Sequence, residues 1–134
     1  MEETPEKLDW VTRRADCELD AAFQKLAVDV EEDVGIFNSR FTLESPQAIV
    51  FRKRAEYPMF SVHRRLPAGT VKVVFSLKSD RIEIEDECGV QALSVIPFLA
   101  DSGRCKFQVG GEEIEQWQLR RKALEAILFK PTPR

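Results

Sequence analysis

The stretch TVKVVFSLKSDRIEIEDE, residues 70–87, decides the fold class. Apolar and polar residues alternate through 70–78 and again through 81–87, which is the two-residue period of a half-buried strand. Only Ser79 and Asp80 separate the two runs. We therefore expect an antiparallel hairpin with a tight turn at this point of the chain.

The register of this hairpin follows from its two-residue turn. It sets Lys72 opposite Glu87, a favourable pair, and Lys78 opposite Arg81, which carry like charges. The mild repulsion in the second pair leaves a longer loop with a shifted register as an alternative.

Further strands are expected on both sides of the hairpin. Runs rich in β-branched and aromatic residues cover 47–54, 60–66 and 104–109. Residues 91–100 are continuously apolar and contain Pro97, which suits an edge strand or a covering segment. Because sequential strands with short connections usually pair, the whole predicts an antiparallel sheet of five or six strands.

The N-terminal part predicts one long helix. Apolar residues recur every three or four positions over 8–37, which is the pattern of an amphipathic helix. Thr4 and Pro5 fit its start, and Gly35 and Asn38 fit its end. About 28 residues make a helix near 40 Å long, whereas a five-stranded sheet is only about 20–25 Å wide. We therefore expect the helix to overhang the sheet, to bend, or to pack on a second copy of the chain.

The segment 112–130 predicts a second helix. Acidic residues fill its first turn and Lys130 ends it, both of which suit the helix dipole. The order of helix, strands and helix predicts an α+β fold of two layers, with both helices on one face of the sheet. We expect one domain over 1–134, with 1–6 and 131–134 as flexible ends.

Charge is unevenly distributed, although the net charge is only −3. Residues 1–37 carry eleven acids and four bases, residues 38–81 carry three acids and nine bases, and residues 82–134 carry nine acids and seven bases. The basic middle third indicates either an acidic partner or pairing with another segment of the same fold.

The basic run FRKRAEYPMFSVHRR, residues 51–65, separates into two faces once strand alternation is applied. Phe51 and Phe60 are expected to face the helices. The opposite face is the predicted binding face, and it consists of Arg52, Arg54, His63, Arg65 and Lys72. Sheet-based RNA binders stack bases on aromatic residues of their basic face, and here only Tyr57 in a turn is available for stacking. Nucleic acid is therefore not the favoured partner, and a solvated or protein-facing surface is.

The end of the first predicted helix is acidic. Its carboxylates are those of Asp29, Glu31, Glu32 and Asp33. They meet the negative end of the helix dipole, at a cost of up to about 1 kcal/mol each, which basic neighbours would offset. We expect acid–base pairing between this helix end and the strand residues Arg52 and Arg54, within one chain or across a homodimer. A solvated acidic helix end is the alternative.

No pattern in the sequence specifies a reaction. Ser61 and His63 lie two positions apart on a strand, about 7 Å, which is too far for the hydrogen bond of a catalytic triad. Glu83, Glu85 and Glu87 share one strand face, but nearby lysines make an ordinary charged face the better interpretation than a cation site. We therefore expect no enzymatic activity, no metal and no cofactor.

The cysteines and the hydropathy bear on the compartment. Cys17, Cys88 and Cys105 form no CxxC pair and no Cys/His ligand cluster, so we expect three buried, inert thiols in a reducing cytoplasm. No apolar run approaches the roughly 18 residues of a membrane span, and the acidic N-terminus lacks the apolar region of a secretory signal.

Together, these features predict a cytoplasmic, non-enzymatic association domain that acts as a homodimer or as a protein-partner module. Two alternatives remain. The first is a protein with a pocket for a small apolar ligand between helix and sheet. The second is a weak, electrostatic nucleic-acid binder that uses the basic sheet face.

Overall fold

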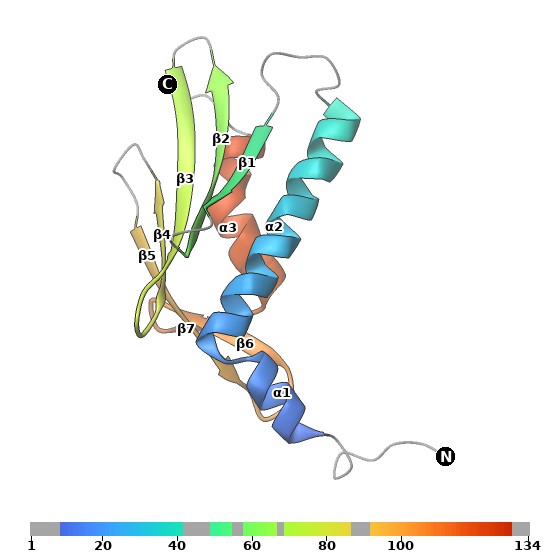
Figure 1. Cartoon of the computed structure of the whole chain (residues 1–134), viewed down its shortest axis with the longest axis vertical. Helices are drawn as coiled ribbons and strands as arrows, with labels where there is room; N and C mark the ends of the chain where they lie inside the picture. The colour runs from blue at the N-terminus through green and yellow to red at the C-terminus, as the bar shows by residue number, and fades with distance from the viewer. Residues whose placement is uncertain (1–8, 42–48, 55–57, 67–68, 87–91, 130–134) are drawn as a thin grey trace.

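The computed structural model describes residues 9–41, 49–54, 58–66, 69–86 and 92–129. Its helices are α1 (Trp10–Asp16), α2 (Leu19–Phe41) and α3 (Gln116–Phe129). Its strands are β1 (Ile49–Arg54), β2 (Met59–Leu66), β3 (Gly69–Leu77), β4 (Ile82–Asp86), β5 (Ala92–Leu99), β6 (Cys105–Val109) and β7 (Glu112–Ile114). The helices pack against one antiparallel sheet (Figure 1), which confirms the predicted α+β class. Among the described residues, no helix has both the length and the hydropathy of a membrane span.

The sheet is a meander, because the seven strands that the structure describes are hydrogen-bonded in chain order from β1 to β7. The hairpin of β3 and β4 has the predicted tight turn, and the backbone N–H of Lys78 donates to the carbonyl oxygen of Arg81 at 2.8 Å. The like charges of Lys78 and Arg81 do not shift the register, because the guanidinium of Arg81 binds the carboxylates of Asp80 and Glu83. The alternative with a longer loop is therefore wrong.

Strand β5 is an interior strand, although its proline is typical of an edge. Its first half pairs with β4 and its second half pairs with β6, and the two pairings overlap only at Val95. Pro97 lies in the second half, opposite Phe107 of β6. At this position β5 has a strand on one side only, so the missing N–H of proline is tolerated as it is at a sheet edge.

The predicted start of the last helix is wrong. Residues 112–114 form β7, and α3 begins only at Gln116, so the described part of the chain has seven strands instead of five or six. Gly110 and Gly111 have φ angles of +58° and +87°. Glycine adopts these angles readily, and two of them in succession make the tight turn that returns the chain along β6.

The single helix predicted over 8–37 is interrupted, because the chain turns at Cys17 between α1 and α2. The backbone N–H of Cys17 donates to carbonyl oxygens in the last turn of α1, which ends that helix. α1 begins after Asp9, whose carboxylate accepts hydrogen bonds from the backbone N–H and the hydroxyl of Thr12. The start expected at residues 4–5 lies outside the described residues.

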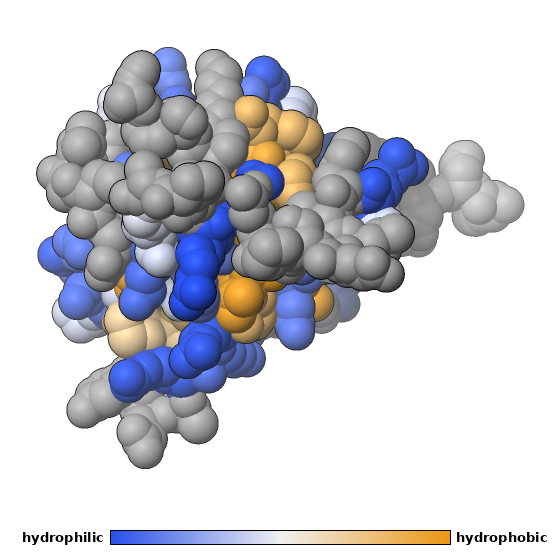
Figure 2. Space-filling view, turned by 90° about the horizontal axis from the view of Figure 1, so that it is seen from above, coloured by the Kyte–Doolittle hydropathy of each residue, from blue (hydrophilic) through white to orange (hydrophobic). Residues whose placement is uncertain are grey.

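The core lies between the sheet and the helices. Along α2 the predicted apolar stripe is buried, with Leu26 and Val30 wholly inaccessible. Phe60 of β2 stacks on Phe75 of β3 with ring centroids 4.4 Å apart, and it also contacts Phe23 of α2 at 5.3 Å. These ring contacts hold α2 against the sheet. Viewed from above, hydrophobic residues are visible between hydrophilic ones (Figure 2).

A disulfide joins Cys17, at the junction of α1 and α2, to Cys105 of β6. The prediction of inert thiols is therefore wrong for these two residues, while Cys88 lies outside the described residues. The two cysteines are 88 positions apart in sequence, and only the fold brings their Cα atoms to 5.5 Å. Since α1 contributes no buried residue, it is anchored by the disulfide and by a hydrogen bond from Arg13 to the carbonyl oxygen of Gly103 at 3.0 Å.

Candidate binding face on the sheet

The predicted basic residues lie on the sheet face that the described helices do not cover. Alternation along β1 and β2 directs Phe51, Phe60 and Val62 into the core, so their sequence neighbours point the other way. The outward set consists of Arg52 and Arg54 of β1, His63 and Arg65 of β2, and Lys72 of β3. We call this set the basic face.

Cross-strand pairing holds the members of the basic face side by side. His63 lies opposite Lys72 on one side and Val50 on the other, and Arg52 lies opposite Ser61. Strands are about 4.8 Å apart and residues rise about 3.3 Å along a strand. Arg52, His63 and Lys72 therefore form a cluster, while Arg54 and Arg65 lie on either side of it, roughly 20 Å apart along the strands. Long side chains at this spacing form one continuous charged surface.

A hollow of about 650 Å³ lies on this part of the sheet. Its lining consists of Arg52, Lys53, Arg54, Met59, Phe60, Ser61, Lys72 and Val74. The guanidinium and ammonium groups are hydrogen-bond donors for anions, while Met59 and Val74 offer apolar contact between them. The hollow is therefore suited to an anionic segment that also carries apolar side chains.

The imidazole of His63 responds to the charge of the basic face. Partial burial lowers the pKa of His63, and the positive charges of Arg52, Lys72 and Arg65 lower it further. Cations on β1, β2 and β3 thus all disfavour protonation of the same imidazole. Because the pKa of His63 lies below the ordinary value of 6.5, the imidazole is mainly neutral at pH 7.

Carboxylates on β4 border the basic face. Glu83 and Glu85 point to the same side of the sheet, opposite residues of β3. Two hydrogen bonds from the guanidinium of Arg81, at 3.1 and 2.9 Å, balance the charge of Glu83. Glu87, expected on the same face, lies outside the described residues. The basic surface is therefore confined to β1, β2 and β3.

Arg64 is a residue that sequence reasoning missed. It is 9% exposed on the inner side of β2, and its Nη1 donates to the carbonyl oxygens of Ile127 at 2.9 Å and Leu128 at 3.1 Å. The guanidinium carbon lies 5.4 Å from the ring centroid of Phe37, and the buried Nε has no hydrogen-bond partner among the described residues. A cation placed here satisfies carbonyls at the end of α3 and opposes the helix dipole, so Arg64 supports the fold from the face opposite to the basic face.

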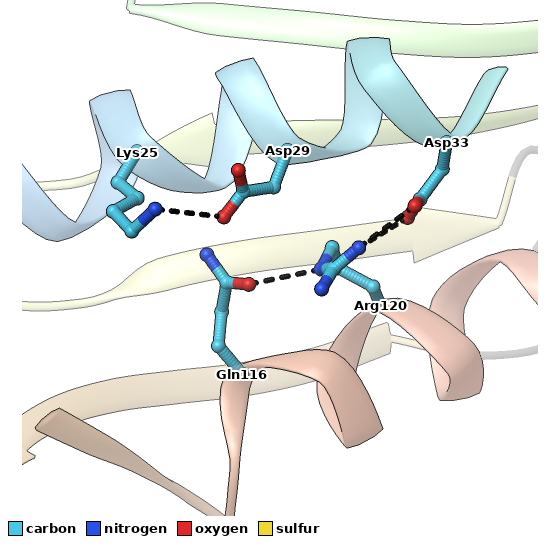
Figure 3. A network of polar contacts seen from close by, with 5 residues as sticks. All are labelled: Lys25, Asp29, Asp33, Gln116 and Arg120. Carbon is cyan, nitrogen blue, oxygen red and sulfur yellow. Dashed lines mark hydrogen bonds and ion pairs between the residues drawn. The ribbon is translucent and has the colours of Figure 1, made fainter. Parts of the chain in front are cut away.

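The acidic end of α2 is engaged inside the helical layer. Asp29 forms an ion pair with Lys25 at 3.2 Å, one turn away. Both carboxylate oxygens of Asp33 accept hydrogen bonds from Nη1 of Arg120 on α3, at 2.8 and 2.7 Å (Figure 3). The Nε of Arg120 also donates to the side-chain oxygen of Gln116 at 2.9 Å, which fixes the guanidinium in this position.

The expected pairing of this acidic end with the basic strands does not form through Asp29 or Asp33. The reason is geometric, because α2 packs on the inner face of the sheet and the basic face is the outer one. Glu31 and Glu32 are exposed on the solvent side of α2. Pairing of Glu31 and Glu32 with the basic strands of a second copy stays a prediction.

Among the described residues, no group of three or more His, Cys, Asp or Glu side chains is arranged to hold a metal ion. The sequence matches no protein-family model and no curated protein, and the fold matches no solved structure. The charge and shape of the surfaces described above are therefore the basis for a functional proposal.

Proposed function

We propose that the chain is a non-catalytic association domain that binds an acidic segment of a protein on its basic face. One observation carries the proposal: cationic groups from three adjacent strands share the outer face of the sheet. Like charges held side by side repel one another, and an acidic partner relieves that repulsion on binding.

An acidic protein segment fits this face better than a nucleic acid does. Among the described outward residues of β1, β2 and β3 there is no Phe, Tyr or Trp on which a base stacks. Val50, Met59 and Val74 lie between the cations, and these apolar side chains match those of a peptide better than a phosphate backbone. Nucleic-acid binding by charge alone is the competing outcome of the experiment below.

A pocket for a small apolar ligand is less well supported. A hollow of about 960 Å³ lies beside α1, α2 and α3, but its lining carries charged side chains of both signs, among them Arg13, Lys25 and Asp29. Sites for apolar ligands are lined mainly by hydrophobic and aromatic residues.

The disulfide bears on the compartment in which the domain works. Disulfides persist in oxidising compartments and are rare in the cytosol. The bond between Cys17 and Cys105 therefore argues for a secreted or otherwise oxidising environment, against the cytoplasmic location expected from the sequence. Mass spectrometry of protein that is alkylated at lysis, without reductant, shows whether the bond exists in the native source. An intact disulfide is expected, and alkylated Cys17 and Cys105 would favour the reducing cytoplasm instead.

Fluorescence anisotropy with two labelled probes tests the proposed function. The probes are a 15-residue peptide of alternating Glu and Leu, and an oligothymidylate of 15 nucleotides. We expect the peptide to bind more tightly than the oligonucleotide. Binding should weaken at least tenfold in Arg52→Glu and in Lys72→Glu, and not in Lys122→Glu, which makes the same charge change on the exposed side of α3.

Tighter binding of the oligonucleotide would replace the proposal with the nucleic-acid alternative. Absence of binding by both probes at low salt would refute a role for the basic face. An equal loss of affinity in Lys122→Glu would show that net charge is responsible, and not this face.

A further inference from the structure

The solvent side of α3 has a large exposed aromatic residue at each end. Leu119, Ala123, Leu124 and Ile127 form the buried side of the helix. Trp117 is 53% exposed in its first turn, and Phe129 is 62% exposed in its last. Between them, Arg121 and Glu125 form an ion pair at 3.3 Å. The ring of Phe129 also packs edge-on against Phe37 of α2, with ring centroids 5.5 Å apart. The exposed parts of the two aromatic side chains lie on the same helix as Arg121, a combination typical of protein interfaces.

A hollow of about 330 Å³ runs along this side of α3. It is lined by Asp33, Trp117, Arg120, Arg121, Leu124, Glu125, Leu128 and Phe129. The two hydrogen bonds between Asp33 and Arg120 hold α2 and α3 together along its edge (Figure 3). The groove is thus formed before any partner arrives, which lowers the entropic cost of binding.

The arrangement of these residues is complementary to itself. Trp117 and Phe129 are equally far from Ala123 in sequence, on either side of it, and Arg121 and Glu125 are too. We infer that α3 is the interface of a homodimer, in which α3 of a second copy lies antiparallel across the groove. A two-fold axis that crosses the exposed side of α3 at the height of Ala123 then sets Trp117 against Phe129 of the second copy, and Arg121 against Glu125 of the second copy, each twice.

Charge explains why the occupant is a second copy in the antiparallel direction. In that direction each Arg121 meets a Glu125 of the other copy, so these two pairs of charges attract each other. A parallel pair of α3 helices would set Arg121 against Arg121 and Glu125 against Glu125, which is repulsive. This interface is different from the predicted pairing of the acidic end of α2 with the basic strands of a second copy.

The size of α3 sets the expected affinity. Its 14 residues span about 21 Å, so an interface made by this helix is smaller than the roughly 800 Å² per partner of a standard complex. Dissociation is therefore expected on the order of micromolar concentration, with the aromatic ends contributing most of the affinity.

This inference does not rest on the proposed function, because the two surfaces lie in opposite layers of the domain. If the α3 dimer forms and the basic face binds acidic segments, the dimer presents two basic faces that point away from each other. Such a dimer binds two acidic segments at once, and a partner that carries both segments gains affinity from the linkage.

Sedimentation equilibrium over a concentration series tests the dimer without any partner. The molar mass should rise from the chain mass of 15.4 kDa towards twice that value as concentration increases. Arg121→Glu should weaken dimerisation at least tenfold, because the introduced carboxylate then faces Glu125 of the second copy. The double variant Arg121→Glu/Glu125→Arg should restore it, since both pairs across the interface return with their charges exchanged.

Lys78→Glu is the matched control, because it makes the same charge change at an exposed position between β3 and β4, outside α3 and outside the lining of the groove. Circular dichroism confirms that each variant is folded, and Trp117→Ala provides a second disruption that involves no charge. A monomer at all concentrations would overturn the inference. So would a dimer that Arg121→Glu leaves intact, or a double variant that stays as weak as the single one.

Discussion

Reduction of the disulfide between Cys17 and Cys105 is expected to destabilise the domain by several kcal/mol. The bond closes a loop with a sequence separation of 88 residues. In the chain-entropy model, a cross-link across a loop of this length removes about 15 cal/mol/K of entropy from the unfolded chain, or about 4.6 kcal/mol at 25 °C. For a domain of this length, such a loss lowers the melting temperature by roughly 15 °C.

Equilibrium unfolding in urea measures this difference between the oxidised protein and the protein reduced with dithiothreitol. The double variant Cys17→Ala/Cys105→Ala should behave like the reduced protein, and Cys88→Ala, which leaves the disulfide intact, should not. Hydrogen exchange should accelerate in α1, which has no buried residue, more than in β2 and β3. A difference of less than about 1 kcal/mol in free energy of unfolding between oxidised and reduced protein would refute the stabilising role of the cross-link.

Three further predictions concern single residues. Arg64→Met should lower the free energy of unfolding, measured in urea, by about 2 kcal/mol, because two hydrogen bonds to carbonyl oxygens of α3 are lost. Arg65→Met on the outer face should change it by less than about 0.5 kcal/mol, and equal effects of the two variants would contradict the role of Arg64. Asn38→Ala should speed hydrogen exchange at the amide of Ile49, because the Asn38 side chain accepts from that N–H at 3.0 Å and donates to the carbonyl oxygen of Ile49 at 2.8 Å. An unchanged exchange rate would show that this contact does not protect β1. The lowered pKa of His63 means that the unfolded chain binds more protons than the folded one near and below pH 6.5, so stability should rise with pH through this window and fall on acidification. In thermal melts, the melting temperature of His63→Gln should depend less steeply on pH, and an identical pH dependence would contradict the assignment.

Patterns between residues that are close in sequence predict much of this structure. The alternation in 70–87 predicts the hairpin and its register correctly, because pairing across a two-residue turn is decided locally. The apolar spacing in α2 predicts its buried side for the same reason. The same alternation places Arg52, Arg54 and His63 on one face, and the structure has them there.

Features that depend on distant segments could not be predicted in this way. No spacing rule relates Cys17 to Cys105, since only the packing of the helices on the finished sheet brings the end of α1 to β6. The partner of Asp33 is similarly a residue of the last helix. Arg64 is an intermediate case, because alternation with Val62 points it inward, but an inward arginine makes sense only once the carbonyl oxygens at the end of α3 are known to lie above it.

The order of the strands has a consequence for how the domain folds. Every hydrogen-bonded pair of strands is consecutive in the chain, so each step of sheet formation closes only a short loop and costs little entropy. Such a sheet has a low contact order for a β-rich protein and is expected to fold faster than a sandwich with Greek-key connections. Packing of α2 against α3 joins opposite ends of the chain, so it is expected to follow the sheet and to determine the rate at which the domain closes.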